Sequence, residues 1–364
     1  MSYHIIFTYA PIVVWLLTCL LFVRSLRLKT RAQAIWAAAL LLCFAKFLCF
    51  AALGGSIFTP DLPAGVIWAW DWLYSRAMIL FALSLVIFFR FPGKAWALPL
   101  IAWGLSAWGL WNGVKAPGVA EVEIAFRQLP PELDGYRIVQ LADVHCSSAA
   151  RRWRTQAIVD AVNALDADLI CLTGDNVDGS VERQGDSLAP INDLRAKDGV
   201  LACSGNHEYY SDYHDWRMRF YDPAKRIRFL TNECVFPRKG LAVGGVPDPV
   251  GWNRGLDEPP SIAGAFASAT NGEFRVLLQH RPMLETEDFR EEGVDLQLSG
   301  HTHGGIAPIL RALVARFNLG FVCGLYRFGD RVLYVSPGCG QWAGFPMRFF
   351  NPSEITLIRL SKAK

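Results

Sequence analysis

Four long apolar segments near the start of the 364-residue chain limit what it can fold into. Each contains about 20 residues, the length that an α-helix needs to cross the hydrocarbon core of a bilayer. The chain as a whole is 52% hydrophobic and contains 13 Trp, which is more than an ordinary soluble domain of this size carries. The sequence therefore predicts about four transmembrane helices, at residues 5–23, 35–58, 66–89 and 95–114.

Charge divides the chain into two regions. Up to residue 116, nine Lys and Arg stand against two Asp and Glu, whereas the remaining 248 residues carry 27 against 31. The second region is mildly acidic and long enough for one large α/β domain with a sizeable core. Pro and Gly interrupt the pattern at 114–120. We therefore place an all-α membrane domain at 1–116 and a globular domain at 117–364.

Charged residues inside the apolar segments need an explanation, because a charge in lipid is costly. Lys46 lies in the second segment, and Asp71 and Arg76 lie in the third among Trp and Tyr residues. We expect an aromatic belt at the membrane–water interface, where charged side chains extend toward water. An intramembrane functional site is the alternative.

The short loops between the segments predict an orientation. The loop after the second segment, TPDLPAG, has no Lys or Arg, and by the positive-inside rule the basic loops face the cytoplasm. Both termini, and with them the globular domain, are then expected outside the cytoplasm. The basic loop residues are Arg24, Arg27, Lys29 and Arg31 after the first segment and Arg90 and Lys94 after the third.

The globular domain alternates strands and helices. Near-continuous apolar runs are typical of strands buried on both faces, as in layered α/β folds. Five such runs occupy residues 136–145, 168–175, 199–207, 273–280 and 295–303. Residues 151–166 have helical spacing, 321–338 predict a hairpin that turns at Gly329 and Asp330, and 354–360 predict a last strand.

Each of these five strands ends in side chains that bind metals. The carboxyl ends of the strands form the ligand crevice of an α/β sheet, so five such endings can converge at one place. Five of the seven histidines stand at these ends, whereas structural histidines would be scattered. Each motif alone is weak, but the ordered set predicts a metal site. Its candidates are Asp143, His145, Asp175, Asn206, His207, His280, His301 and His303.

The ordered motifs resemble those of the calcineurin-like metallophosphoesterases. They read DVH at 143–145, GDN at 174–176, GNHE at 205–208, QH at 279–280 and GHTH at 300–303. The stretches GNHEYY, SGHTHGG and RFFNPSEITLI also resemble a bacterial branch that is secreted or membrane-anchored. The resemblance covers most of residues 121–360. It implies an α/β fold, a four-layer αββα sandwich of two mixed β-sheets flanked by helices, with metals at the strand ends.

The resemblance also implies how the residues act. Two divalent metal ions share a bridging carboxylate and a hydroxide that attacks phosphorus in line. Oxygen and imidazole donors suit Mn, Fe, Zn or Ni. The motifs make Asp175 the bridge, with Asp143, His145 and His303 on one metal and Asn206, His280 and His301 on the other; spacing alone does not assign each histidine to a metal.

Four further residues lie next to these motifs. In the family, the histidine at the position of His207 lies near the metals without binding them and stabilises the transition state or protonates the leaving oxygen. Arg281 is a weaker candidate for binding a substrate phosphate, with a structural salt bridge as the alternative. Asp178 is expected to be a turn residue. Glu208 is expected either to orient His207 or to lie at the surface.

The leading hypothesis is a membrane-anchored phosphoesterase, preferably a phosphodiesterase, in the bacterial cytoplasmic membrane. An integral membrane anchor favours a phosphorylated, lipid-linked substrate. One alternative is the hydrolysis of UDP-2,3-diacylglucosamine in lipid A synthesis. Another is a catalytically inactive membrane component for transport or assembly. No nucleic-acid partner is expected, because the globular domain has a net negative charge and no basic stripe.

Overall fold

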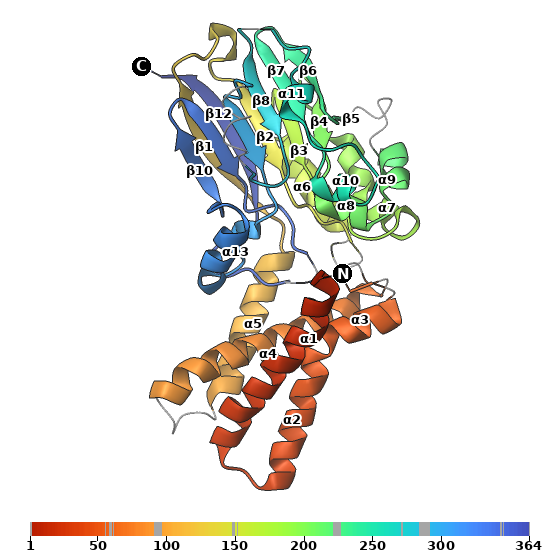
Figure 1. The fold of residues 1–364 in the computed structure, drawn as a ribbon, viewed down its shortest axis with the longest axis vertical. Coiled ribbons are helices and arrows are strands. Elements are labelled where there is room, and N and C mark those ends of the chain that lie inside the picture. Colours follow the sequence, from red (N-terminus) through yellow and green to blue (C-terminus); the bar gives the residue numbers. More distant parts are fainter. Residues whose placement is uncertain are drawn as a thin grey trace. The chain divides into compact units, whose positions relative to one another are not determined.

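Two compact units make up the chain in the computed structural model. The structure describes all residues except 1, 55, 58–59, 61, 91–96, 148–149, 151, 221–226, 271, 284–291, 343, 345 and 364. The membrane unit contains Met1–Val114 and Trp342–Arg348, and the globular unit contains Lys115–Gln341 and Phe349–Lys364. The two units are drawn in Figure 1, and each is described here by itself.

All described secondary-structure elements before residue 115 are helices. The first helix continues through a π-helical and a 3-10 turn to Leu26, and the second and third meet at Ala45 with a bend of 51°. The elements are α1 (Ser2–Thr18), η1 (Cys19–Val23), η2 (Arg24–Leu26), α2 (Thr30–Phe44), α3 (Lys46–Gly54), α4 (Ala64–Arg90) and α5 (Leu98–Val114).

The number of helices able to span a membrane is smaller than the sequence predicts. Among the described residues, Tyr9–Leu26 and Ala64–Leu85 are long and apolar enough, and the bent pair α2–α3 makes a third if it is counted as one span. The bend at Ala45 divides the second predicted segment. The fourth yields α5, whose 17 residues are short of the about 20 that a span needs. The preceding residues 91–96, with Lys94, lie outside the described residues.

Lys46 and Asp71 do not extend toward water. Nζ of Lys46 lies 2.7 Å from Oδ1 of Asp71, and neither side chain is more than 2% exposed. The ammonium also lies 5.1–5.3 Å from the ring centroids of Phe47, Phe50 and Tyr74. The interfacial interpretation is therefore wrong for this pair, because α3 and α4 bury both charges against each other. A charge pair inside the helical bundle replaces it.

Asp71→Ala is expected to destabilise the membrane unit. The substitution leaves the ammonium of Lys46 buried without its counter-ion, and breaking a buried pair in this way costs about 3–5 kcal/mol. Thermal unfolding of the purified chain in detergent measures the effect. The double variant Lys46→Met with Asp71→Leu removes both charges and is expected to restore most of the stability. A single variant as stable as the parent would contradict the burial of the pair.

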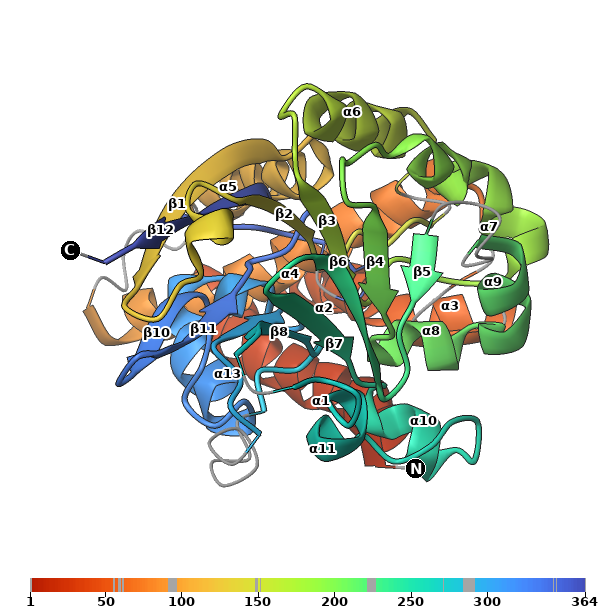
Figure 2. The ribbon, with the colours of Figure 1, turned by 90° about the horizontal axis from the view of Figure 1, so that it is seen from above.

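Two six-stranded mixed sheets build the globular unit, and Figure 2 shows them facing each other. The strands are β1 (Gly118–Phe126), β2 (Arg137–Leu141), β3 (Leu169–Thr173), β4 (Val200–Cys203), β5 (Ile227–Phe229), β6 (Glu233–Arg238), β7 (Leu241–Gly245), β8 (Phe274–Leu278), β9 (Leu296–Ser299), β10 (Gly324–Phe328), β11 (Arg331–Val335) and β12 (Glu354–Lys362). The first sheet has the order β1-β12-β2-β3-β4-β5 and the second β10-β11-β9-β8-β7-β6. Both mix parallel and antiparallel pairs.

Helices cover the outer faces of the two sheets. On the first sheet, α6 (Arg152–Asn163) packs Ile158 and Val162 against strand residues such as Val139. On the second, α11 (Ile262–Ala265) packs beside Ala242 and Leu277. A third core, which includes residues of β2, β3, β8 and β9, fills the space between the sheets. The predicted four-layer sandwich is therefore confirmed.

The five predicted strands are all present, as β2, β3, β4, β8 and β9, and each ends a few residues before the predicted boundary. Residues after the last ladder hydrogen bond are thus free to form loops. The predicted hairpin also forms, with β10 and β11 joined at Gly329 and Asp330. Strand ends from both sheets consequently supply the loops that carry the candidate residues.

Candidate metal centre

Loops after five strands bring the candidate residues to one place. Three ligand groups arise, and within each group the ligand atoms lie within 4.8 Å of one another. The groups are Asp143 with His145 and His303, then Asp175 with His280 and His301, and then His145 with Asp175 and His207. Asp175 is a member of two groups. The centre is buried apart from His301, which is partly exposed.

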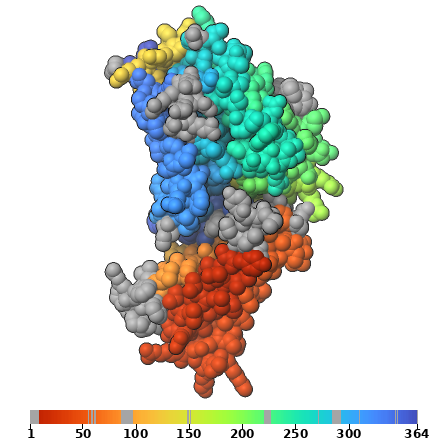
Figure 3. All heavy atoms as spheres, in the orientation of Figure 1, coloured from red at the N-terminus to blue at the C-terminus, as the bar shows by residue number. Residues whose placement is uncertain are grey.

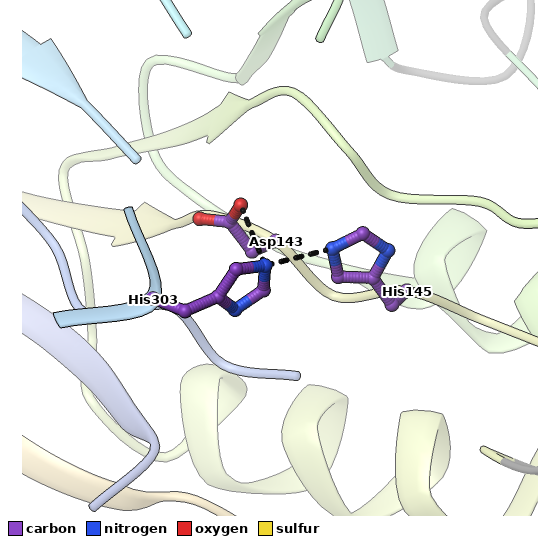
Figure 4. Close-up of side chains that lie close together, drawn as sticks. All are labelled: Asp143, His145 and His303. Carbon is purple, nitrogen blue, oxygen red and sulfur yellow. Dashed lines mark hydrogen bonds and ion pairs between the residues drawn. The ribbon is translucent and has the colours of Figure 1, made fainter. Parts of the chain in front are cut away.

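The first group joins β2 of one sheet to β9 of the other. Nε2 of His145 lies 3.2 Å from Nε2 of His303, which in turn lies 3.6 Å from Oδ1 of Asp143. Figure 4 shows the two rings turned toward each other beside the carboxylate. Two imidazole nitrogens at this distance repel when both carry lone pairs. A divalent cation between them and the carboxylate removes that repulsion.

The second group is oriented by the backbone. Nδ1 of His280 lies 2.8 Å from the carbonyl oxygen of Thr173, and because a carbonyl only accepts, Nδ1 carries the proton. The other nitrogen, Nε2, faces the centre and lies 3.1 Å from Oδ2 of Asp175. A fixed tautomer of this kind is what a metal-binding histidine needs.

Asn206 offers an amide oxygen to the same place. Its residue is 5% exposed, and no described residue donates a hydrogen bond to Oδ1. A buried oxygen left without a donor is costly, and a divalent cation is a partner that would satisfy it. The backbone N–H of the next residue, His207, donates to Oδ1 of Asp175 at 2.8 Å, so the amide lies next to the bridging candidate. The donor set therefore fits divalent metals.

The backbone of the centre is strained. Five candidate ligands adopt φ values between 47° and 69°, a region that residues other than glycine rarely occupy: Asp143, His145, Asp175, His301 and His303. Each such residue costs about 1–3 kcal/mol, which persists only where the surrounding structure imposes it. Glycine would relieve the strain but would supply no ligand atom. Such strain clusters at functional sites, which supports a ligand role for these five positions.

Two glycines allow the loops to approach each other closely. A Cβ at Gly205 would lie 2.2 Å from Oδ1 of Asp175, so only glycine fits beside the carboxylate. A Cβ at Gly304 would lie 1.4 Å from Nδ2 of Asn351, which donates to the carbonyl oxygen of Gly304 at 2.8 Å. With a φ of 62°, Gly304 also makes the turn that the sequence predicts after the last ligand.

Asp178 is not merely a turn residue, and this prediction was wrong. Its Oδ1 lies 2.5 Å from Nδ1 of His207 and its Oδ2 lies 3.1 Å from Nδ1 of His145, with 2% of the residue exposed. Burial raises the pKa of Asp178, but the two histidines outweigh burial and lower the pKa to about 2. The carboxylate therefore directs Nε2 of both rings into the centre. Its signal in the sequence is a second carboxylate three residues after Asp175.

His207 carries a proton at neutral pH. Burial lowers the pKa of the imidazole, but the carboxylates of Asp175 and Asp178 outweigh burial and raise the pKa to about 9. Nε2 lies 4.0 Å from Oδ2 of Asp175, longer than the 3.1 Å of His280. The ring is thus an oriented proton donor at the edge of the ligand groups.

Glu208 lies in the interior and not at the surface. The residue is 1% exposed, and its carboxylate accepts hydrogen bonds from the backbone N–H groups of Asp175 at 3.0 Å, Asn176 at 2.7 Å and Gly205 at 2.7 Å. These amides belong to the loops after β3 and β4. Glu208 therefore holds the two loops together, whereas no hydrogen bond to His207 is among the described contacts.

Arg281 forms a structural salt bridge, the alternative that the sequence left open beside phosphate binding. Nε lies 2.6 Å from Oδ2 of the buried Asp248, and the arginine side chain is 23% exposed. Burial and, after it, the charge of Arg281 lower the pKa of His301 well below its ordinary value. The guanidinium therefore lies beside the centre, at a partly open position.

The sequence of this region was compared with known proteins. The family model for calcineurin-like phosphoesterases matches residues 136–305, which include every candidate ligand. Residues 136–305 of the chain are a calcineurin-like phosphoesterase domain. Four strands of the two sheets, β1, β10, β11 and β12, lie outside the matched residues.

Relatives of this chain occur in animals and in bacteria. A zebrafish (Danio rerio) "transmembrane protein with metallophosphoesterase domain" is 32% identical over 271 residues, which are 71% of this chain and 61% of the relative. A protein of the same name from Bos taurus is 30% identical, covering 71% and 60%. An "uncharacterized metallophosphoesterase" from Helicobacter pylori is 34% identical, covering 69% and 66%. The match thus spans less than two thirds of each of these relatives.

Proposed function

We propose that the chain is a metal-dependent phosphoester hydrolase with two divalent cations. The observation that carries the proposal is the position of Asp175, which forms one ligand group with His280 and His301 and another with His145 and His207, while His145 also forms a group with Asp143 and His303. One cation is assigned to Asp143, His145 and His303, and the other to Asn206, His280 and His301, with Asp175 between them. Bound there, the cations would supply an activated water and neutralise charge on the phosphoryl group.

The protein's own residues have distinct tasks in this proposal. His207, protonated at neutral pH, donates a proton or a hydrogen bond to the oxygen that leaves phosphorus. Asp178 keeps that ring and His145 oriented through their Nδ1 atoms. Arg281, beside His301 and partly open to solvent, is the candidate contact for a substrate phosphate oxygen.

A direct assay tests the proposal. The full chain, purified in detergent, is analysed for bound metal and assayed with Mn²⁺ on bis(p-nitrophenyl) phosphate and on p-nitrophenyl phosphate. Bound metal with turnover, faster on the diester, is the expected result. A folded preparation with neither metal nor turnover would refute the proposal and favour the inactive transport or assembly component.

The proposed substrate is a phosphate ester or pyrophosphate carried by a lipid. The support is the chain's apolar helices together with relatives named as transmembrane proteins with a metallophosphoesterase domain. Hydrolysis of UDP-2,3-diacylglucosamine remains the alternative, and it requires a catalytic unit on the cytoplasmic side. The side of the membrane therefore discriminates between these two substrates.

We propose that the globular unit lies outside the cytoplasm of a bacterium, anchored in the cytoplasmic membrane. The argument is the basic loop after the first helical segment, with Arg24, Arg27, Lys29 and Arg31, combined with an even number of spans: either the two helices Tyr9–Leu26 and Ala64–Leu85 or all four predicted segments. Alkaline phosphatase and green fluorescent protein, each fused after residue 364, report opposite sides. Phosphatase activity without fluorescence is expected, and the reverse result would refute the orientation.

Asp178→Asn is expected to lower kcat by about 10–100-fold, the usual cost of losing a partner that orients a metal ligand. The amide keeps the shape of the carboxylate but not its charge, so His207 loses its counter-ion and His145 its orientation. We expect kcat and metal affinity to fall while KM for bis(p-nitrophenyl) phosphate stays unchanged. Asp186→Asn is the matched control, because that carboxylate is 82% exposed. Unchanged kcat and metal content in Asp178→Asn would contradict the assigned role.

A further inference from the structure

The short helix that follows the last ligand loop has an unusual surface. α13 (Arg311–Phe317) has the sequence RALVARF, in which five of seven residues are apolar, and none of the seven is buried. Leu313 is 54% exposed and Phe317 is 78% exposed. Since residues four apart lie on the same face of a helix, these two side chains form one outward-facing apolar pair.

Two neighbouring residues enlarge this apolar surface. Leu319, directly after the helix, is 62% exposed, and Phe350 is 80% exposed. The backbone N–H of Phe349 donates to the carbonyl oxygen of Ile306 at 3.1 Å, which places the segment of Phe350 beside the loop leading to α13. We call Leu313, Phe317, Leu319 and Phe350 the α13 patch. The helix is coloured blue in Figures 1 and 3.

Every charged residue between residues 296 and 329, the stretch that contains α13, is an arginine. Arg311 and Arg316 are both exposed and stand on the same helix as Leu313 and Phe317. Between Asp295 and Asp330 the sequence contains no Asp or Glu, although the globular domain as a whole is acidic. Apolar side chains flanked by arginines, without carboxylates, suit the boundary between acyl chains and anionic headgroups.

We propose that the α13 patch inserts into the surface of the bilayer that the chain's own apolar helices span. Connectivity supports this occupant, because only three residues separate the end of α5 at Val114 from the start of β1 at Gly118. Such a connection reaches at most about 14 Å when fully extended. The globular unit therefore begins close to the end of the apolar helix α5.

The patch is continuous with the metal centre. α13 begins eight residues after His303, and Arg311 packs so closely on the ligand loop that a Cβ at Gly305 would lie 2.7 Å from its Cγ. Insertion of α13 would thus hold the ligand loop at the lipid surface. Together with the proposed function, on which this step rests, insertion gives the substrate class. The substrate is a phosphate ester whose lipid chain stays in the bilayer during hydrolysis.

Fluorescence quenching in nanodiscs tests the insertion. The full chain with Phe317→Cys is labelled with bimane and placed in phosphatidylcholine–phosphatidylglycerol nanodiscs, with or without dibrominated acyl chains. The matched control is Phe236→Cys on β6, an apolar residue 49% exposed. The parent chain, labelled in the same way, corrects for native cysteines such as the partly exposed Cys323.

Brominated lipid is expected to remove about half of the fluorescence at position 317, as a side chain inserted 5–10 Å deep requires, and to leave position 236 unchanged. Aqueous iodide is expected to quench the label at position 236 more strongly than the label at position 317. Equal quenching by bromine at both positions would overturn the proposal. Protection of position 317 from iodide without quenching by bromine would also overturn it, since a protein would then cover the patch.

A second measurement separates this inference from the proposed function. Leu313→Ser with Phe317→Ser is expected to slow hydrolysis of hexadecyl p-nitrophenyl phosphate in the nanodisc several-fold, without changing turnover of soluble bis(p-nitrophenyl) phosphate. An equal loss of turnover on both substrates would refute the claim that the α13 patch delivers the substrate from the lipid. Bromine quenching at position 317 in a parent chain that hydrolyses neither substrate would refute the proposed function and leave the insertion standing.

Discussion

Asp175→Ala is expected to remove the bound metal and to lower turnover by more than about 10³-fold, because the electrostatic stabilisation that the metals supply is lost with them. Oδ2 of Asp175 lies 3.1 Å from Nε2 of His280, 3.9 Å from Nε2 of His145 and 4.0 Å from Nε2 of His207. Burial raises the pKa of Asp175, but these histidines outweigh burial and hold it well below its ordinary value. Alanine leaves them around a site without an anion.

The test compares metal content and turnover with those of the parent chain. Elemental analysis of the purified variant counts the metals, and bis(p-nitrophenyl) phosphate with added Mn²⁺ measures turnover. Asp186→Ala on α7 (Val181–Leu188) controls for the loss of a carboxylate, because Asp186 is 82% exposed and outside the centre. An Asp175→Ala variant that retains two metals would show that this residue is not the bridge.

His207→Gln is expected to lower kcat by about 10²–10³-fold while the metal content stays at that of the parent, since general acid catalysis contributes within this range. Glutamine still reaches hydrogen-bonding partners near Asp178 but has no proton to release at neutral pH. The ligand atoms of Asn206 and Asp175 are untouched. The effect therefore differs in kind from the loss of Asp175.

Leaving groups of different basicity distinguish the roles of His207. If the imidazolium protonates the leaving oxygen, the loss in kcat is larger for a phenyl ester than for a p-nitrophenyl ester, whose leaving group is stable as an anion. His214→Gln is the control, because His214 is exposed on α9 (Tyr213–Phe220). Loss of a metal from His207→Gln would identify the residue as a ligand instead.

The candidate ligands could be located in the sequence because each follows an apolar run. Asp143 comes two residues after the buried strand β2, and His280 two residues after β8. Strands without such a run were missed. β1 buries two of its nine residues and β6 buries one of its six, so neither contains the continuous apolar run that indicates a buried strand.

Contacts between distant segments were not predictable from one sequence. Asp178 becomes a positioning residue only because the loops after β2 and β3 run side by side, with an isolated bridge between Cys146 and Val177. In the same way, Lys46 and Asp71 meet because α3 and α4 pack together. Apolar patterns specify which side chains are buried, whereas the pairing of buried polar groups depends on how the elements pack.

The position of β12 makes the order of synthesis matter for the metal centre. β12 lies between β1 and β2, and its pairing joins Gly118 to Glu354, 236 residues further along the chain. β1 therefore has no strand to pair with in the first sheet until β12 has emerged from the ribosome, which is a slow, long-range step. A nascent chain that has reached residue 340 contains every candidate ligand, yet the edge of β2 is still open. The first sheet, which carries the loops of Asp143, Asp175 and Asn206, is therefore complete only after β12 has been translated.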